Sequence, residues 1–235
     1  FRAEIEEVYR RVKDHSFMKD SDEEEKANWR KRIDDVLASS DLEKMDYVEH
    51  AGTMQGDYFI MHNGLKILPL SYYGWPVLQM LHETKGIHEP QEEYVFQEVL
   101  KGMKKGAVML ELGAYWSFYS MWFNKEVENG KNYMIEPWEL HHGIRNFELN
   151  NLKGEFFKYY ISETPGFHND GNEIISVDQF MKDHCCYSAG WAAAPLRLSF
   201  RSRLAFQASV SATSWTGPLR MYLSISPISM TNNTL

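Results

Sequence analysis

Two acidic residues and one glycine stand where short apolar runs end, as in a cofactor site. Glu111 and Gly113 close the run 107–112, and Glu136 closes another apolar run 25 residues after Glu111. A carboxylate at the second position can accept hydrogen bonds from both hydroxyls of a ribose, and each charge-assisted bond contributes about 1.5–3 kcal/mol. Gly113 lets the backbone approach a ligand where a Cβ atom would collide. These residue types indicate a nucleoside-containing cofactor.

A parallel sheet is needed to bring these residues together. From residue 107 onward the apolar runs predict strands over 107–112, 133–135 and 155–161, separated by helices over 115–127 and 138–151. Alternating strands and helices of this length predict parallel pairing with right-handed crossovers. In such sheets ligands bind beyond the carboxyl ends of the strands, which is where Glu111 and Glu136 lie.

Several short motifs follow one another in a fixed order over residues 88–183. They supply Glu111, Gly113, Ala114, Tyr115 and Ser117, then Glu136 and Pro137, Asn150 and Asn151, Ser162, and finally Ser176, Val177, Asp178 and Phe180. This ordered set resembles FkbM-type S-adenosylmethionine-dependent methyltransferases. In that family an acid-x-Gly-Ala-Asn-x-Gly turn ends the first strand and Glu-Pro ends the second. An Asn-rich helix end, a strand ending near Ser and a (Thr/Ser)-(Leu/Val)-Asp-x-Phe stretch follow.

The chain departs from the family pattern in the first turn and after the last motif. Tyr115 stands where the family has Asn, and Ser117 stands where it has the second Gly. Ser117 is expected to cap the helix that follows. The family's later strand, which ends in Asp-(Ile/Val)-(Glu/Gln)-Gly, has no counterpart here. The resemblance therefore covers a cofactor half and leaves the acceptor half unmatched.

The resemblance implies a Rossmann-like class I methyltransferase sheet within an α/β fold, and the residue patterns predict N-terminal helices and a β-hairpin before it. It implies S-adenosylmethionine as cofactor and transfer of its methyl group to an oxygen, or less often a nitrogen, of a small molecule or glycan. The residues expected to bind the cofactor are Glu111, Gly113, Ala114, Tyr115, Glu136, Pro137, Trp138 and Ser162. The sequence identifies no catalytic residue.

Several of these positions have a second interpretation. Trp138 either stacks on adenine or is a packing residue near a helix start. Ser162 either approaches the adenine amine or belongs to a polar loop. His141 and His142 invite a metal interpretation, but neighbouring helix residues point about 100° apart, so no metal site is expected.

Two other function classes compete with the methyltransferase. One is a catalytically inactive cofactor-binding or interaction module, because the acceptor-side segment is unmatched. The other is a dehydrogenase-like dinucleotide domain, which is weaker because the sequence lacks Gly-x-Gly-x-x-Gly.

The chain is predicted to divide into four segments. These are a helical segment (1–56), a β-hairpin with an aromatic loop (57–88), a partial S-adenosylmethionine-binding α/β domain (89–184) and an atypical tail (185–235). Ser21 and Glu24 have capping-box spacing, with Ser21 as N-cap. Asn63-Gly64 suits a two-residue hairpin turn, since both residue types tolerate φ > 0.

Composition narrows the classes of partner. The 235 residues carry a net charge of −8, which argues against nucleic-acid binding, and no apolar run is long enough to span a membrane. Cys185 and Cys186 are adjacent and read as ordinary thiols of a reducing compartment, which predicts a cytoplasmic location. The start at Phe1, with no signal-like segment after it, predicts a fragment boundary.

The tail differs abruptly in composition from the rest of the chain. All 33 acidic residues and all but four of the 25 basic residues lie in 1–184, which therefore carries −12. The tail shows no sustained period of 3.6 or 2 residues. It is a disordered extension, a small all-β addition or, as we favour, a gene read out of frame after about Cys185.

Overall fold

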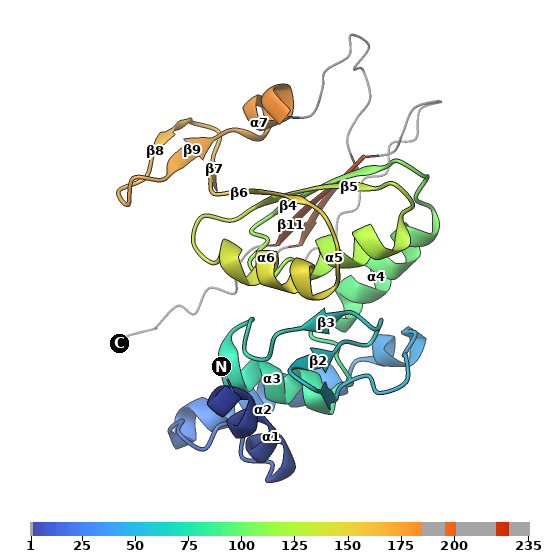
Figure 1. Ribbon diagram of the computed structural model, residues 1–235, viewed down its shortest axis with the longest axis vertical. Coiled ribbons are helices and arrows are strands. Elements are labelled where there is room, and N and C mark those ends of the chain that lie inside the picture. Colours follow the sequence, from blue (N-terminus) through green and yellow to red (C-terminus); the bar gives the residue numbers. More distant parts are fainter. Residues whose placement is uncertain (1, 185–195, 201–219, 226–235) are drawn as a thin grey trace. The chain divides into compact units, whose positions relative to one another are not determined.

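The structure is a computed structural model that describes residues 2–184, 196–200 and 220–225 (Figure 1). It is a mixed α/β protein with two compact units. The helical unit comprises Phe1–Gly102 and Arg145–Leu152, and the sheet unit comprises Met103–Ile144 and Lys153–Leu235. No described helix is long and apolar enough to cross a membrane.

The helical unit contains a small antiparallel sheet with the strand order β1-β2-β3. Its elements are α1 (Arg2–Lys13), α2 (Glu23–Leu37), the 3₁₀ helix η1 (Ser40–Lys44), β1 (Met54–Gln55), β2 (Tyr58–Ile60), β3 (Lys66–Ile67), α3 (Gly74–Glu83), α4 (Pro90–Lys101) and the second half of α6 (Leu140–Leu149). Strands β2 and β3 form the predicted hairpin. Gly64 has a φ of +82° in its turn, a conformation that favours glycine.

Two local predictions in the helical unit were wrong. Asp22, rather than Ser21, is the N-cap of α2, and its Oδ1 accepts a hydrogen bond of 2.8 Å from the Glu25 backbone N–H. Aspartate caps as well as serine does, so the sequence pattern fits either residue. The predicted aromatic loop over 71–76 is partly helical, because α3 already begins at Gly74.

The sheet unit is built on a five-stranded parallel sheet (Figure 1). Its spatial order is β10 (Leu196–Phe200), β11 (Arg220–Ile225), β4 (Val108–Leu112), β5 (Lys131–Ile135) and β6 (Glu155–Phe157). All four neighbouring pairs are parallel, as the alternation of strands and helices predicted for β4, β5 and β6. Strand β4 comes first in the chain but lies at the centre, so the strand order reverses between β4 and β11.

Helices cover the two faces of this sheet. On one face, Asn132 Nδ2 of β5 donates a 2.8 Å hydrogen bond to the Ser120 carbonyl of α5 (Phe118–Glu126). On the other, Leu110 and Ile135 pack in one apolar cluster with Phe180 of α7 (Val177–His184). Alternate residues of β4 and β5 thus face opposite helices, which gives a sheet buried on both sides.

Three predicted boundaries in the sheet unit were wrong. The expected strand over 155–161 is divided, since β6 ends at Phe157 and β7 (Tyr160–Ile161) joins a separate sheet with β9 (Glu173–Ile175) and β8 (Gly166–Phe167). Helix α5 begins at Phe118 rather than at 115, because residues 115 and 117 have left-handed backbone conformations. Helix α6 begins at Leu140 rather than at 138.

The predicted atypical tail contributes strands to the parallel sheet. Strands β10 and β11 pair with each other, and β11 also pairs with β4. Residues 185–195, 201–219 and 226–235, with Cys185 and Cys186 among them, lie outside the described residues.

Candidate functional site

Glu111 lies in β4 with its carboxyl group buried against α5. The residue is 0% exposed, and its Oε2 accepts a 3.1 Å hydrogen bond from the Ser120 backbone N–H. No donor among the described residues reaches Oε1. Burial raises the pKa of this carboxyl to about 8, and the charge of Glu136 raises it too, while hydrogen bonds from Ser120 act in the opposite direction. Glu111 is therefore largely protonated at neutral pH.

Glu136 joins the two loops that follow β4 and β5. Its Oε2 accepts from the Tyr115 backbone N–H at 3.4 Å. Its Oε1 accepts from the backbone N–H groups of Trp138 at 3.0 Å and Glu139 at 3.4 Å. An ionised carboxylate has about four acceptor positions, so three backbone contacts leave room for a further donor. Glu136 can thus organise both loops and still accept from a ligand hydroxyl.

Three residues of the loop after β4 have the left-handed backbone conformation that favours glycine, although two of them are not glycine. Gly113, Tyr115 and Ser117 have φ values of +73°, +40° and +59°. Such conformations cost roughly 1–2 kcal/mol for an ordinary L-residue. The loop therefore has left-handed backbone at Tyr115 and Ser117, the same two positions that depart from the family pattern. Strained backbone of this kind concentrates at binding sites.

Ser117 does not cap α5 with its side chain, so that prediction was wrong. It occupies the N-cap position with a left-handed backbone and makes no side-chain cap hydrogen bond. Its Oγ is buried without a partner among the described residues. The side chain packs against Gly143 of α6, where an added Cβ would lie 3.1 Å from Ser117 Cβ. Gly143 is therefore required by close packing on this loop.

The neighbouring predicted residues complete the edge of the sheet through their backbones. The N–H groups of Gly113 and Ala114 both donate to the Ile135 carbonyl, at 2.9 and 3.1 Å, which ties the end of β4 to the end of β5. The Pro137 carbonyl accepts from Asn172 Nδ2 at 3.4 Å. Tyr115 is half-buried.

Trp138 presents an exposed ring beside this edge. It is 60% exposed, which contradicts the interpretation as a buried packing residue. Its Nε1 donates to Asp170 Oδ2 at 3.1 Å, and its ring meets the Tyr160 ring edge-on at 5.3 Å. Tyr160 in turn stacks on His168 at 4.1 Å. The indole is held in place from one side, with a surface left for a planar ligand.

Ser162 lies in a different setting from the one expected. It is exposed and follows β7, which pairs with β9 rather than with the parallel sheet. Its backbone N–H donates to Ile175, and its Oγ accepts from Thr164. Glu111 lies near the end of β4 and Glu136 directly follows β5, both in the parallel sheet. Ser162, by contrast, follows a strand of the other sheet.

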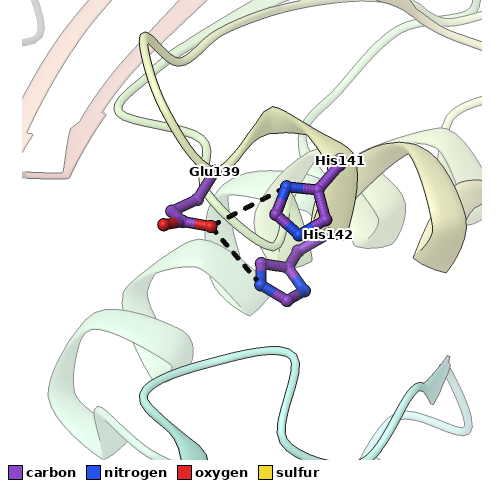
Figure 2. A group of neighbouring side chains, drawn as sticks. All are labelled: Glu139, His141 and His142. Atoms are coloured by element: carbon purple, nitrogen blue, oxygen red, sulfur yellow. Dashed lines mark ion pairs between the residues drawn. The ribbon is translucent and has the colours of Figure 1, made fainter.

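Glu139, His141 and His142 come together at the start of α6 (Figure 2). Glu139 Oε2 lies 3.7 Å from His141 Nδ1 and 3.5 Å from His142 Nε2. The sequence argument about these adjacent histidines considered only their backbone directions. Backbone directions differ by about 100°, but rotation about the side-chain torsions brings the two rings to a centroid separation of 4.0 Å.

Asn146 of α6 and Asn150, which directly follows α6, act within the helical unit, and the motif set had included Asn150. Asn150 accepts from the Lys66 backbone N–H at 2.9 Å and donates to the Lys66 carbonyl at 2.6 Å. Asn146, which the sequence reasoning missed, accepts from the Leu68 N–H at 2.9 Å. Their i, i+4 spacing on one helix face is the signal that would have identified this backbone clamp.

A buried ionic cluster in the helical unit was also missed. Glu93 is 0% exposed and lies 3.0 Å from His62 Nε2 and 2.6 Å from His88 Nδ1. Burial acts to lower the pKa of His88, but Glu93 and Glu89 raise it to about 10. Burial likewise acts to raise the pKa of Glu93, but the charge of His88 holds it below its usual range. The cluster is a buried ionic element in the core of that unit.

Comparison with known proteins gives a partial similarity. A solved structure of an S-adenosylmethionine-dependent methyltransferase from Aquifex aeolicus is 30% identical over the matched part, with a TM-score of 0.24. The match covers 26% of this chain and 35% of that one, so it spans about a third of that methyltransferase. No protein-family model and no curated protein matches the sequence. A TM-score of this size does not establish a shared fold.

Proposed function

We propose that the sheet unit binds S-adenosylmethionine at the carboxyl ends of β4 and β5, and that the protein is a methyltransferase of the FkbM type. The observation that carries the proposal is Glu136, which follows β5 and joins the loops at residues 113–117 and 137–139. These loops lie beside the position where the strand order reverses, between β4 and β11. Ligands of open parallel sheets bind at such positions.

The residues present fit the nucleoside part of this cofactor. Glu136 keeps acceptor capacity for the ribose hydroxyls, and Gly113 has a left-handed backbone that leaves room for close approach. Trp138 offers an exposed ring for the adenine. Ala114, Tyr115 and Pro137 would border the cofactor mainly through the backbone of the two loops. Ser162 is not included, because it follows a strand of the other sheet.

Positioning is the main chemical task for this chain. When bound, the cofactor supplies a sulfonium methyl group that is already activated for in-line displacement. The protein then has to hold the donor and exclude competing orientations, and such positioning can supply roughly 7–11 kcal/mol of a barrier. Glu136 and the loop at 113–117 would fix the donor. The acceptor we propose is an oxygen of a small molecule or glycan, for which no general base is assigned.

Glu111 supports the site indirectly in this proposal. Its hydrogen bond to Ser120 fixes α5 against β4, directly behind the loop at 113–117. A neutral carboxyl here avoids placing a second buried negative charge beside Glu136. We therefore assign Glu111 as a positioning residue.

Calorimetry with S-adenosylhomocysteine on three variants tests the role of Glu136. Glu136→Ala should weaken binding at least about tenfold, because it removes the ribose acceptor and the link between the loops. Glu136→Gln should give a smaller loss, since the amide keeps the shape and one acceptor oxygen. The matched control is Glu126→Ala, an exposed acid at the end of α5 in the same unit. An unchanged dissociation constant for Glu136→Ala would remove Glu136 from the ribose role.

A measurement of methyl transfer, rather than of cofactor binding, distinguishes the methyltransferase from a catalytically inactive module. Tight binding of S-adenosylhomocysteine, with no methyl transfer to a panel of hydroxylated small molecules and glycans, would favour a cofactor-binding module. Transfer to any of them would favour the enzyme.

A further inference from the structure

Glu139, His141 and His142 form a set of metal-ligand types that the proposed methyl transfer does not use. We call it the imidazole–carboxylate cluster. One donor atom from each residue lies within 4.8 Å of the other two (Figure 2). The three residues lie within four consecutive positions, 139–142, around the first residue of α6, so their separation does not depend on the packing of distant segments.

Two of the three donor separations are close to those that a tetrahedral ion requires. Metal–nitrogen and metal–oxygen bonds of about 2.0–2.1 Å at tetrahedral angles place donor atoms roughly 3.3 Å apart. Glu139 Oε2 is 3.7 Å from His141 Nδ1 and 3.5 Å from His142 Nε2. Shifts of a few tenths of an ångström in the side chains would bring both nitrogens to the required separation from the oxygen.

The backbone holds the cluster in place. The His142 N–H donates to the Glu139 carbonyl at 3.0 Å, and the Glu139 N–H donates to Glu136 Oε1 at 3.4 Å. The next residue, Gly143, donates to the Tyr115 carbonyl at 3.0 Å. The ligand-bearing segment is thus fixed at both ends. This preorganisation lowers the entropy lost when an ion binds.

The chemistry and exposure of the three groups indicate the class of ion. Two imidazoles and one carboxylate suit Zn²⁺ and similar first-row ions, whereas Mg²⁺ and Ca²⁺ prefer all-oxygen sites. The side chains of Glu139, His141 and His142 are 44%, 58% and 23% exposed, which gives an ion direct access from solvent.

We propose that the imidazole–carboxylate cluster binds one divalent transition-metal ion, with Zn²⁺ as the representative, through Glu139, His141 and His142. Three protein ligands leave at least one coordination position for water or another ligand. The site is a property of the start of α6 and stands whether or not the sheet unit binds S-adenosylmethionine.

Zinc binding to the full chain tests the proposal, measured by competition with a chromophoric zinc indicator. The starting protein carries Cys185→Ser and Cys186→Ser, so that the adjacent thiols contribute nothing. One equivalent of Zn²⁺ should bind, and His141→Ala and His142→Ala should each weaken binding at least about tenfold. Glu139→Gln, which preserves shape and removes the charge, should weaken it as well.

The matched control is His168→Ala, which removes another imidazole of the sheet unit that is paired with a carboxylate. It should leave zinc affinity unchanged, and circular dichroism should show each variant folded like the parent. The buried pair His62 and His88 serves as a second control through Glu93→Gln. The proposal is overturned if no stoichiometric zinc binds, or if the double variant His141→Ala/His142→Ala binds as the parent does. Loss of binding in His168→Ala or Glu93→Gln alone would place the zinc elsewhere and overturn it equally.

Discussion

Replacing Ser117 by glycine should stabilise the sheet unit, although the serine is fully buried. Ser117 has a φ of +59° and a buried Oγ without a partner among the described residues. Glycine removes the left-handed penalty of roughly 1–2 kcal/mol and the cost of burying an unpaired hydroxyl, about 1–3 kcal/mol. The greater conformational freedom of glycine in the unfolded chain lowers this gain in stability by about 0.5–1 kcal/mol. The net expectation is a gain of about 1–4.5 kcal/mol.

Because Gly143 packs against Ser117, the effects of substitutions at these two positions on stability should be coupled. An alanine Cβ at position 143 would overlap Ser117 Oγ and lie 3.1 Å from both Ser117 Cβ and the Tyr115 carbonyl oxygen. Gly143→Ala in the parent should therefore cost about 1–3 kcal/mol as overpacking. In the Ser117→Gly background two of these three contacts vanish, and the usual helical preference for alanine offsets most of the rest. The cost should fall below about 0.5 kcal/mol.

Urea unfolding of the parent, both single variants and the double variant measures the coupling energy. A coupling of at least about 1 kcal/mol is expected, since the two side chains share one space. Additive effects of the two substitutions, or a loss of stability in Ser117→Gly, would refute the conclusion that Ser117 has a backbone conformation that favours glycine.

Two further predictions concern buried groups. Burial raises the pKa of Glu111 from 4.5 to about 8. The stability that comes from its neutral form is therefore fully present below pH 4.5 and is lost as pH rises through about 8. Over that window the free energy of unfolding falls by at most about 5 kcal/mol. Glu111→Gln should flatten the fall in unfolding free energy between pH 5 and 9, and parallel pH profiles for the two proteins would contradict it. Asn150→Ala should cost about 1–3 kcal/mol in urea unfolding, because it leaves the Lys66 backbone groups without their partner, whereas Glu148→Ala on the exposed side of α6 should change stability by less than about 0.5 kcal/mol. Equal effects of these two variants would remove the clamp role from Asn150.

The sequence predicted the parts of the fold that depend on local pattern. Strand β4 is an apolar run with one acid, β5 ends in the apolar run 133–135, and the hairpin of β2 and β3 surrounds an Asn-Gly turn, so each was located to within a few residues. The division of 155–161 into β6 and β7 could not be read in the same way. Both strands are apolar, and only their pairing with different sheets separates them.

The candidate site was predicted in its residue types and missed in its geometry. Glu136 and Gly113 follow from the ends of apolar runs. The left-handed backbone at Tyr115 and Ser117 does not, because neither residue type signals a positive φ. The short separation of the His141 and His142 rings does not follow from sequence spacing either, because side-chain torsions rather than Cβ directions set it. The buried Glu93 cluster joins residues from separate elements, which a single sequence does not reveal.

Isothermal titration calorimetry of the full chain with S-adenosylhomocysteine, and in parallel with NAD, tests the proposed cofactor site most directly. The arrangement of Glu136, Gly113 and Trp138 predicts one equivalent of S-adenosylhomocysteine bound and no binding of NAD, whose pyrophosphate lacks a glycine-rich cradle here. Binding of NAD in preference to S-adenosylhomocysteine, or binding of neither, would contradict the account.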